Sequence, residues 1–264
     1  MITEVKDGYV KTEKEHGITT IEFYHPQSNS LPGKLLETIA RTIHSEGVNP
    51  DTKVIILRSG GERVFCSGAS LDELATITTA QEGAEFFSGY AKVINAMRNT
   101  PQFIIARIHG KCVGGGVGLA AAADYAIATE GADIKLSELA AGFGPFVIGP
   151  AVQRKIGLSS FTHLTIDANM WRSADWAKRK GLYAEVHPEP AGMEESIERL
   201  SFTLSHFNPD ATKELKKVFW KGTEDWDDLL RERATISGRL ILSEHSRSFI
   251  QKFKSKNKSN INPI

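Results

Sequence analysis

The first half of the chain alternates short apolar runs with segments of helical periodicity, and this alternation limits the fold more than any other feature. Apolar residues recur at helical spacing in 35–43 and in 82–98, between runs rich in β-branched and aromatic residues. Strands that alternate with helices form α/β layers with a largely parallel sheet. The predicted strands are Tyr9–Glu13 and Ile18–Tyr24, joined as a hairpin through His16 and Gly17, and then Val54–Leu57, Phe103–Ile108 and Tyr125–Thr129.

The second half is predicted to be mostly helical, with one strand at Tyr183–His187. A long periodic stretch, 224–253, carries many charges and could pack on its own domain or on a neighbouring subunit. Residues 254–264 are polar and basic and are expected to form a frayed tail. The other predicted helices are Pro150–Ile156, Phe161–Ile166, Ala174–Lys180, Met193–His206 and Ala211–Phe219.

The charge balance and the cysteine content exclude several classes of protein. The 264 residues suffice for a full hydrophobic core, and 32 Lys plus Arg balance 32 Asp plus Glu, so we expect no nucleic-acid partner. No apolar run approaches the length of a membrane span and no secretory signal opens the chain, so we expect no membrane partner and a cytoplasmic protein. Cys66 and Cys112, the two cysteines, are too few for a disulfide framework.

Several familiar catalytic motifs are absent from the sequence, among them G-x-S-x-G, H-E-x-x-H and G-x-x-x-x-G-K-[ST]. Cys66 is interpreted as a small buried hydrophobe and His109 as a structural residue at a strand end. Residues 116–121 match G-x-G-x-x-A, with Glu138 about 20 residues further on. A dinucleotide-dependent oxidoreductase therefore stays open as an alternative, although the helix that this motif would open is short for a Rossmann crossover.

Two glycine-containing segments favour a different kind of site. In 65–71 a strand-like start meets the turn Gly68-Ala69, which can leave a backbone N–H directed into a cleft. In 114–116 three glycines open a helix, where N–H groups are free and the helix dipole is positive. Two such donors together predict an oxyanion hole.

These segments resemble the successive signature segments of the crotonase superfamily, also called the enoyl-CoA hydratase/isomerase family. The resemblance spans most of the chain. It includes Asn29-Ser30-Leu31, Phe65–Leu71, Gly114–Gly118 followed by Asp124, Ser137-Glu138 with Gly142 and Gly149-Pro150, Ala174-x-x-Ala177-x-x-x-Gly181-Leu182, and Ser248–Lys252. It implies an α/β fold with a ββα spiral core and an acyl-CoA site in residues 1–200, and a helical C-terminal trimerisation region in 201–264.

By this resemblance, the N–H groups of Ala69 and Gly115 hold the thioester oxygen of an acyl-CoA as it becomes an enolate. Glu138 matches the glutamate that moves a proton at the α-carbon, a role that needs a pKa raised by an apolar pocket. We expect Leu136, Leu139, Ala140 and Phe143 to form that pocket. Further substrate contacts are expected at Ser28, Ser30, Ser67, Ser70, Leu71, Gly114, Gly118, Ser137 and Gly142, and at Phe249 and Lys252, which match positions that reach the CoA of a neighbouring subunit.

Gly118 departs from the pattern of hydratases that use two glutamates, because it stands where the first glutamate orients the attacking water. We favour a hydratase that acts on a 2-enoyl-CoA, similar to hydratases of branched or carboxylated substrates such as methylglutaconyl-CoA, in branched-chain amino-acid or fatty-acid breakdown. The alternatives are a Δ3,Δ2-enoyl-CoA isomerase that uses Glu138 alone and a non-catalytic acyl-CoA-binding protein. The resemblance implies no metal, no cofactor besides the coenzyme A of the substrate, and a homotrimer or dimer of trimers.

Asp72 is a second departure, because a lysine is common near this position in the family. The resemblance thus leaves the expected entrance for CoA without one positive charge.

Overall fold

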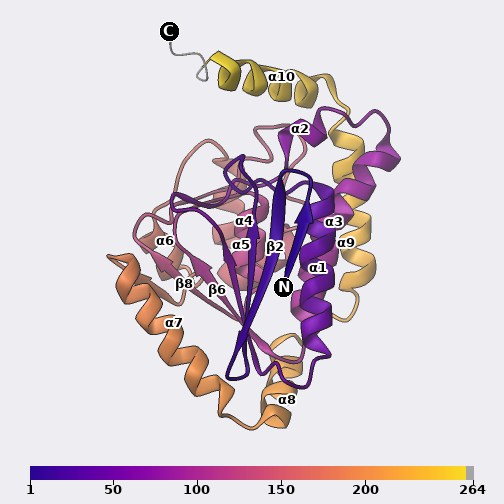
Figure 1. Ribbon diagram of the computed structural model, residues 1–264. Coiled ribbons are helices and arrows are strands. Elements are labelled where there is room, and N and C mark those ends of the chain that lie inside the picture. Colours follow the sequence, from indigo (N-terminus) through magenta and orange to yellow (C-terminus); the bar gives the residue numbers. More distant parts are fainter. Residues whose placement is uncertain (260–264) are drawn as a thin grey trace.

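The computed structural model describes residues 1–259, and the side chains up to residue 255. A seven-stranded sheet has the order β1-β2-β3-β4-β6-β8-β10, in which only β1–β2 and β2–β3 are antiparallel pairs. The prediction of a largely parallel sheet is therefore confirmed (Figure 1). The strands are β1 Ile2–Val5, β2 Gly8–Glu15, β3 Ile18–Tyr24, β4 Val54–Ser59, β6 Phe103–Ile108, β8 Tyr125–Thr129 and β10 Glu185–His187.

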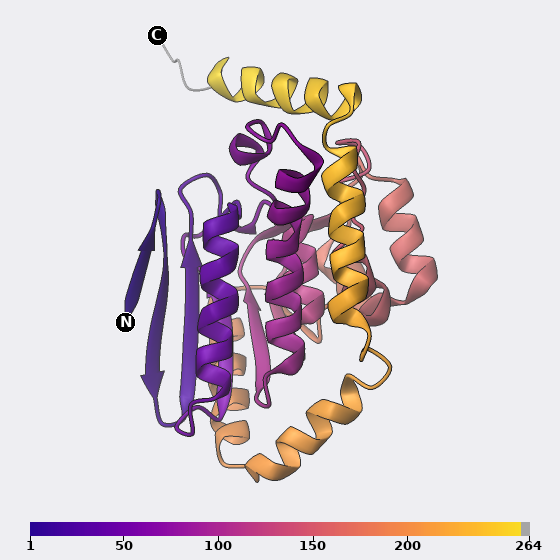
Figure 2. The same ribbon diagram turned by 90° about the vertical axis from the view of Figure 1, so that its right-hand side faces the viewer.

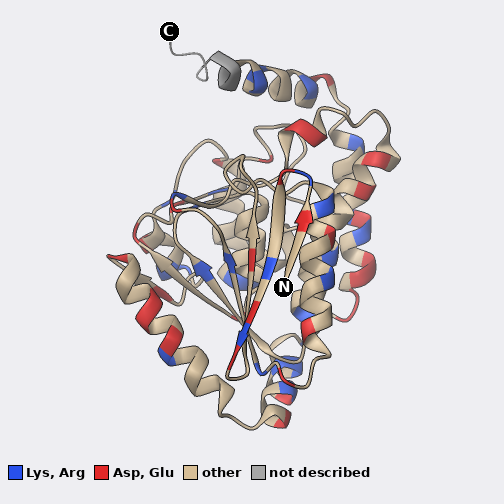
Figure 3. Cartoon of the chain, viewed as in Figure 1, with Lys and Arg blue, Asp and Glu red and all other residues tan. Residues whose placement is uncertain are grey.

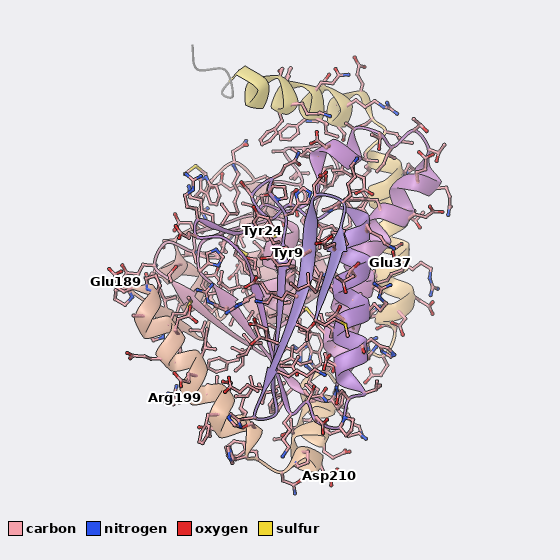
Figure 4. All side chains as sticks on the ribbon, viewed as in Figure 1. Tyr9, Tyr24, Glu37, Glu189, Arg199 and Asp210 are labelled. Carbon is pink, nitrogen blue, oxygen red and sulfur yellow. The ribbon has the colours of Figure 1, made fainter. Side chains whose placement is uncertain are left out.

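The predicted hairpin forms at the edge of this sheet. His16 and Gly17 make its turn with φ of 50° and 82°, and the rings of Tyr9 and Tyr24 stack across the two strands with centroids 5.3 Å apart (Figure 4). The sequence analysis missed β1, which pairs with β2 outside the hairpin. β1 was missed because its alternating exposed and half-buried residues carry little apolar signal.

The two faces of the sheet pack against different helices. Ile55 and Leu57 of β4 belong to the large core under α1 (Gly33–Gly47) and α3 (Ala80–Asn99), whereas Val54 and Ile56 pack with Met193 and Ile197 of α7 (Pro190–Ser205). Successive residues alternate between the faces because the side-chain period of a strand is two. Outward from the sheet, α1, α3 and α9 (Trp226–Leu240) lie one behind the other (Figure 2).

A second, three-stranded parallel sheet carries the segments singled out in the sequence. Its order is β5-β7-β9, with β5 at Val64–Cys66, β7 at Lys111–Val113 and β9 at Ile134–Lys135. The sequence analysis missed it, because strands of two or three residues show no periodicity. Each strand ends just before a site segment: β5 before α2 (Leu71–Leu74), β7 before α4 (Gly115–Ala122), and β9 before Ser137 and Glu138.

The C-terminal half is helical as predicted, with one change. α5 (Gly149–Ile166) is interrupted at Gly157, whose φ of 78° and ψ of 157° are not helical, so the two helices expected on either side of Gly157 are confirmed. The continuous stretch expected at 224–253 is instead broken after Leu240, so α10 (Glu244–Ser259) lies crosswise to α9 (Figure 2). The remaining helices are α6 (Ala174–Arg179) and α8 (Pro209–Phe219).

The frayed tail was expected to begin at residue 254, but α10 continues to Ser259, so this expectation is wrong for residues 254–259. The rest of that tail, 260–264, lies outside the described residues. The expected division of the chain near residue 200 stays a prediction, and that residue lies within α7.

Most helices carry charged side chains of both signs (Figure 3). The short helix α2 is an exception with only Asp72 and Glu73, and the described part of α10 is mainly basic, with Arg247, Lys252 and Lys254 against Glu244. Over the whole sequence the formal net charge is zero. Among the described residues, no helix is long and apolar enough to cross a membrane.

Candidate functional site

A cavity of about 300 Å³ lies where the second sheet, α3 and α4 meet the C-terminal helices. Eight of the expected site residues line it together, which are Ser67, Ala69, Leu71, Gly114, Gly115, Ser137, Glu138 and Phe249. Most of the remaining lining is apolar, with Phe87, Phe143 and Val147 among the lining residues. The structure therefore brings segments between Ser67 and Phe249 to one cavity.

Ala69 and Gly115 line this cavity, and their backbone N–H groups have no acceptor in the described part of the chain. The N–H of Gly115 opens α4, and the first N–H groups of a helix have no intrahelical acceptor. The turn that carries Ala69 is adjacent, because a Cβ built on Gly68 would lie 3.6 Å from the nitrogen of Gly115. The chain on either side of Ala69 is bonded to Leu31, whose N–H donates to the Gly68 carbonyl at 2.8 Å and whose carbonyl accepts from the N–H of Ser70 at 3.4 Å. The N–H groups of Ala69 and Gly115 thus belong to adjacent segments of the cavity lining, as the predicted oxyanion hole requires.

Gly114 allows this turn to approach the carboxyl group of Glu138. Its φ of 53° and ψ of −117° lie outside the regions that other residues adopt without strain. A Cβ at Gly114 would lie 2.6 Å from Oε1 of Glu138. The absence of a side chain at this position therefore allows the carboxyl group to lie directly beside the turn that carries Gly114 and Gly115.

The carboxyl group of Glu138 is buried, and its Oε2 has no hydrogen-bond partner in the described part of the chain. Burial raises its pKa from 4.5 to about 7, although the backbone N–H groups of Ser137 and Glu138 lower it in part. The carbonyl of Glu138 accepts from the N–H groups of Phe143 and Gly144, each at 3.1 Å, and these bonds hold the turn in place. A carboxyl group poised near neutral pH can both take and give a proton.

The apolar surroundings of Glu138 differ in part from those expected. Phe143 lines the cavity as expected, but Leu139 is 48% exposed, so its expected contribution to the pocket is wrong. Residues 138–140 form a turn, which directs neighbouring side chains to opposite sides. Phe87 of α3 and the loop 143–148 provide apolar lining in its place.

Gly118 does not line the cavity, because the side chain of Ile148 lies against it. A Cβ at Gly118 would lie 2.5 Å from Cγ2 of Ile148. Ile148 is 4% exposed and is itself part of the cavity lining. An isoleucine side chain therefore fills the space that a carboxylate at residue 118 would need.

Two other expected contact residues have structural roles outside the lining. The hydroxyl of Ser30 lies 3.0 Å from Nδ1 of His25, and both residues are buried. Ser70 caps the short helix α2 by accepting from the N–H of Glu73.

Ser28, Gly142 and Lys252 are also outside the lining. Ser28 is exposed, and its carbonyl accepts from the N–H of Ser67 at 3.2 Å. Gly142, with a φ of 93°, packs against Ser246 of α10. Lys252 is exposed on α10, whereas Phe249 of the same helix contributes to the cavity of its own chain.

The sequence analysis missed six lining residues that carry an aromatic ring or a charge, namely Phe87, Tyr90, Lys135, Phe146, Trp171 and Phe253. Phe87 and Tyr90 stand on the apolar face of a predicted helix, where periodicity indicates core packing. At the rim, the ammonium groups of Lys111 and Lys135 lie 4.9 and 5.5 Å from the centre of the Trp171 ring. Lys111, Lys135 and Trp171 are far apart in the sequence, so no local sequence pattern could predict their contact.

The positive charge that the sequence lacks beside Asp72 comes from α10. Nζ of Lys254 lies 2.9 Å from Oδ1 of Asp72, and Gln27 donates to Oδ2 at 2.6 Å. This contact joins the last helix to α2, over which α10 lies in Figure 1.

The structural interpretations of Cys66 and His109 are supported. Cys66 is fully buried, and burial raises the pKa of its thiol to about 12. Burial lowers the pKa of His109 to about 4, so this imidazole is neutral at physiological pH. Within the described residues, no group of three or more His, Cys, Asp or Glu side chains could hold a metal ion.

Known proteins similar to this chain share one family and one fold. Residues 13–262 match the family described as Enoyl-CoA hydratase/isomerase. YngF of Bacillus subtilis (strain 168), whose name places it among enoyl-CoA hydratases/isomerases, is 30% identical over 222 residues, 83% of this chain and 84% of that protein. The mitochondrial methylglutaconyl-CoA hydratase of Homo sapiens is 32% identical over 159 residues, 60% of this chain and 46% of that protein.

A solved structure confirms the expected fold. The crystal structure of enoyl-CoA hydratase from Bacillus halodurans matches with a TM-score of 0.84 at 21% identity, over 92% of this chain and 99% of that one. The α/β fold with a crotonase-like core, predicted from the signature segments, is thus confirmed.

Proposed function

Since the chain belongs to the enoyl-CoA hydratase/isomerase family and is an enzyme of this type, we propose that its cavity binds an acyl-CoA thioester and that Glu138 moves a proton at the α-carbon. The observation that carries this proposal is the buried Oε2 of Glu138, which lacks a partner beside two free backbone N–H groups. A buried acceptor without a partner costs free energy, which a bound substrate can recover.

The proposed chemistry begins when the carboxylate of Glu138 takes a proton from the α-carbon. The electron pair of the broken C–H bond moves to the thioester oxygen, and the N–H groups of Ala69 and Gly115 stabilise the resulting enolate. One such donor commonly contributes about 2.7–4 kcal/mol to transition-state stabilisation. The reaction uses only groups of the chain and of the CoA substrate.

For the outcome, we favour isomerisation of a 3-enoyl-CoA to a 2-enoyl-CoA over the hydration that the sequence analysis favoured. Glu138 takes the proton from C2 and returns it to C4, so the double bond moves from C3–C4 to C2–C3 without loss of atoms. This reaction needs one carboxyl group. Ile148 fills the space beside Gly118, and a second glutamate that would orient water has no room there.

Hydration of a 2-enoyl-CoA is the second candidate. Similarity to the human methylglutaconyl-CoA hydratase over 60% of this chain supports it. A hydratase built on this site would need another group to hold the attacking water. Assembly into trimers and the cytoplasmic location stay predictions.

The ultraviolet absorbance of the conjugated 2-enoyl thioester tests the proposal. We expect this absorbance to rise when the enzyme acts on a 3-enoyl-CoA. A fall with a panel of 2-enoyl-CoAs, methylglutaconyl-CoA included, would instead support hydration. In either case Glu138→Gln should lower turnover at least about 10²-fold. Glu189→Gln should not, because Glu189 is exposed just before α7 (Figure 4) and is not a lining residue of the cavity.

Stabilisation of the fold by acyl-CoA without any product would contradict the proposed catalysis. It would leave a non-catalytic acyl-CoA-binding protein, because ligand binding shifts unfolding whether or not chemistry follows. Stabilisation by a dinucleotide would favour the oxidoreductase alternative.

A further inference from the structure

Tyr90 of α3 lines the cavity, and its buried hydroxyl group has no partner among the described residues. The residue is 3% exposed. Buried polar atoms in folded proteins nearly always have a partner, so an exception needs an explanation. Glu138 is the other cavity-lining residue described with such an atom.

The ring of Tyr90 lies against Gly115, which provides one of the two oxyanion N–H groups. A Cβ built on Gly115 would lie 2.6 Å from Oη of Tyr90. One built on Gly114 would lie 2.6 Å from Oε1 of Glu138. The two glycines of the oxyanion turn are therefore flanked by a carboxyl group and by a phenol.

Packing explains the ring of Tyr90 but not its hydroxyl group. The neighbouring apolar positions of α3 hold Phe86 and Phe87, whose rings pack with centroids 5.3 Å apart. Tyr183 shows the ordinary pattern for a buried tyrosine, since its hydroxyl donates to the carbonyl of Ala132 at 3.0 Å. A phenylalanine at residue 90 would fill the same space without leaving a donor unpaired.

The phenol of Tyr90 is neutral at physiological pH. Burial raises its pKa well above the ordinary value of 10.0, and the nearby Glu138 raises it further. A neutral phenol has one O–H donor.

We propose that the hydroxyl group of Tyr90 donates a third hydrogen bond to the thioester oxygen, beside the N–H of Gly115, as that oxygen becomes an enolate. This inference rests on the proposed function. It adds Tyr90 to the catalytic residues of the proposed reaction. Because the Tyr90 ring lies against Gly115, a thioester oxygen that accepts from the N–H of Gly115 would also lie near the Tyr90 hydroxyl. That oxygen would give the hydroxyl the hydrogen-bond partner that it lacks among the described residues.

Acetoacetyl-CoA tests this proposal directly, because its enolate form absorbs in the ultraviolet and forms without turnover. We expect the wild-type protein to enolise the bound ligand, and Tyr90→Phe to lower the affinity and the enolate absorbance. In catalysis kcat should fall by about 10²-fold while KM changes little, since the bond strengthens with the enolate charge. The melting temperature should not fall, because the hydroxyl that is removed has no partner.

Tyr183→Phe is the matched control, since it removes a buried hydroxyl that is hydrogen-bonded outside the cavity. It should lower the melting temperature and leave the enolate absorbance at the wild-type level. A Tyr90→Phe protein that keeps the wild-type affinity and enolate absorbance would overturn the proposal for Tyr90, whatever the turnover. If the wild type shows no turnover but Tyr90→Phe still lowers the enolate absorbance, the proposed reaction is refuted and the proposed role of Tyr90 stands.

Discussion

Two buried carboxyl groups stand at opposite ends of α4, and they differ in what surrounds them. Asp124 follows the C-terminal end of the helix. It accepts from the N–H of Ile104 at 2.8 Å, from Nε1 of Trp220 at 3.2 Å and from the ammonium group of Lys216. Glu138 lies against the N-terminal end, and its Oε2 has no partner among the described residues.

The difference separates a structural carboxylate from a reactive one. Asp124 joins β6 to α8, and Lys216 is almost fully buried with it, at 4% side-chain exposure. A charge with this many donors loses little by being buried. Only the backbone N–H groups of Ser137 and Glu138 favour the charged form of Glu138, and burial outweighs them and raises its pKa. A buried charge that the fold leaves unsatisfied thus indicates where a ligand binds.

The largest effect is expected for the reactive member of the pair. Glu138→Gln keeps the shape of the side chain but cannot carry a proton, so turnover should fall about 10²–10⁴-fold. The absorbance assay on enoyl-CoA substrates measures this loss. Turnover within about twofold of wild type would show that Glu138 is not the proton-transfer group.

The structural member should respond in stability and not in chemistry. Asp124→Ala leaves Lys216 buried without its partner, and breaking a buried ion pair typically costs about 3–5 kcal/mol. Urea denaturation measures this loss of unfolding free energy, while kcat per folded molecule should stay within about threefold of wild type. The double variant Asp124→Leu/Lys216→Met is the control, because it removes both charges and should recover part of the loss. An unchanged stability would contradict the contrast between the two carboxyl groups.

The pKa of Glu138 predicts a pH dependence of both activity and stability. Proton removal needs the carboxylate, so the rate should rise with pH and level off above about 7. The stability depends on pH because the pKa of Glu138 is higher in the folded state than in the unfolded state, so the folded state binds this proton more tightly. Unfolding free energy should therefore fall by roughly 3 kcal/mol as pH rises from about 4.5 to above 7.

Glu138→Gln isolates this contribution, because the variant has no group that titrates there. The stability difference between variant and wild type should grow in favour of the variant from about pH 5 to about pH 8. A difference that does not change with pH would mean that Glu138 has an ordinary pKa in the folded state.

The smallest effect is expected at a third carboxylate, which is exposed. Asp72 and Lys254 form an ion pair with side-chain exposures of 50% and 38%. Such pairs contribute about 0–1 kcal/mol, so Asp72→Asn should change the unfolding free energy by less than about 1 kcal/mol. A larger loss in urea denaturation would show that docking of α10 on α2 depends on this pair.

Much of the fold and part of the site could be predicted from the sequence. The apolar runs at Ile18–Tyr24 and Phe103–Ile108 correspond to β3 and β6 because each is long enough for the β pattern to show. The glycines at 114 and 115 were informative because a close approach of backbone to another group tolerates no side chain. The β5-β7-β9 sheet could not be found, since its strands are too short.

The sequence by itself determined which residues are present for chemistry: one glutamate at residue 138, two glycines at 114 and 115, and no carboxylate at 118. The tertiary structure decided their surroundings. Ile148, thirty residues beyond Gly118, fills the space beside it, and Tyr90 reaches Gly115 from another helix. These contacts join residues far apart in the chain. They depend on how α3, α4 and the loop before α5 pack, and local periodicity carries no information about that packing.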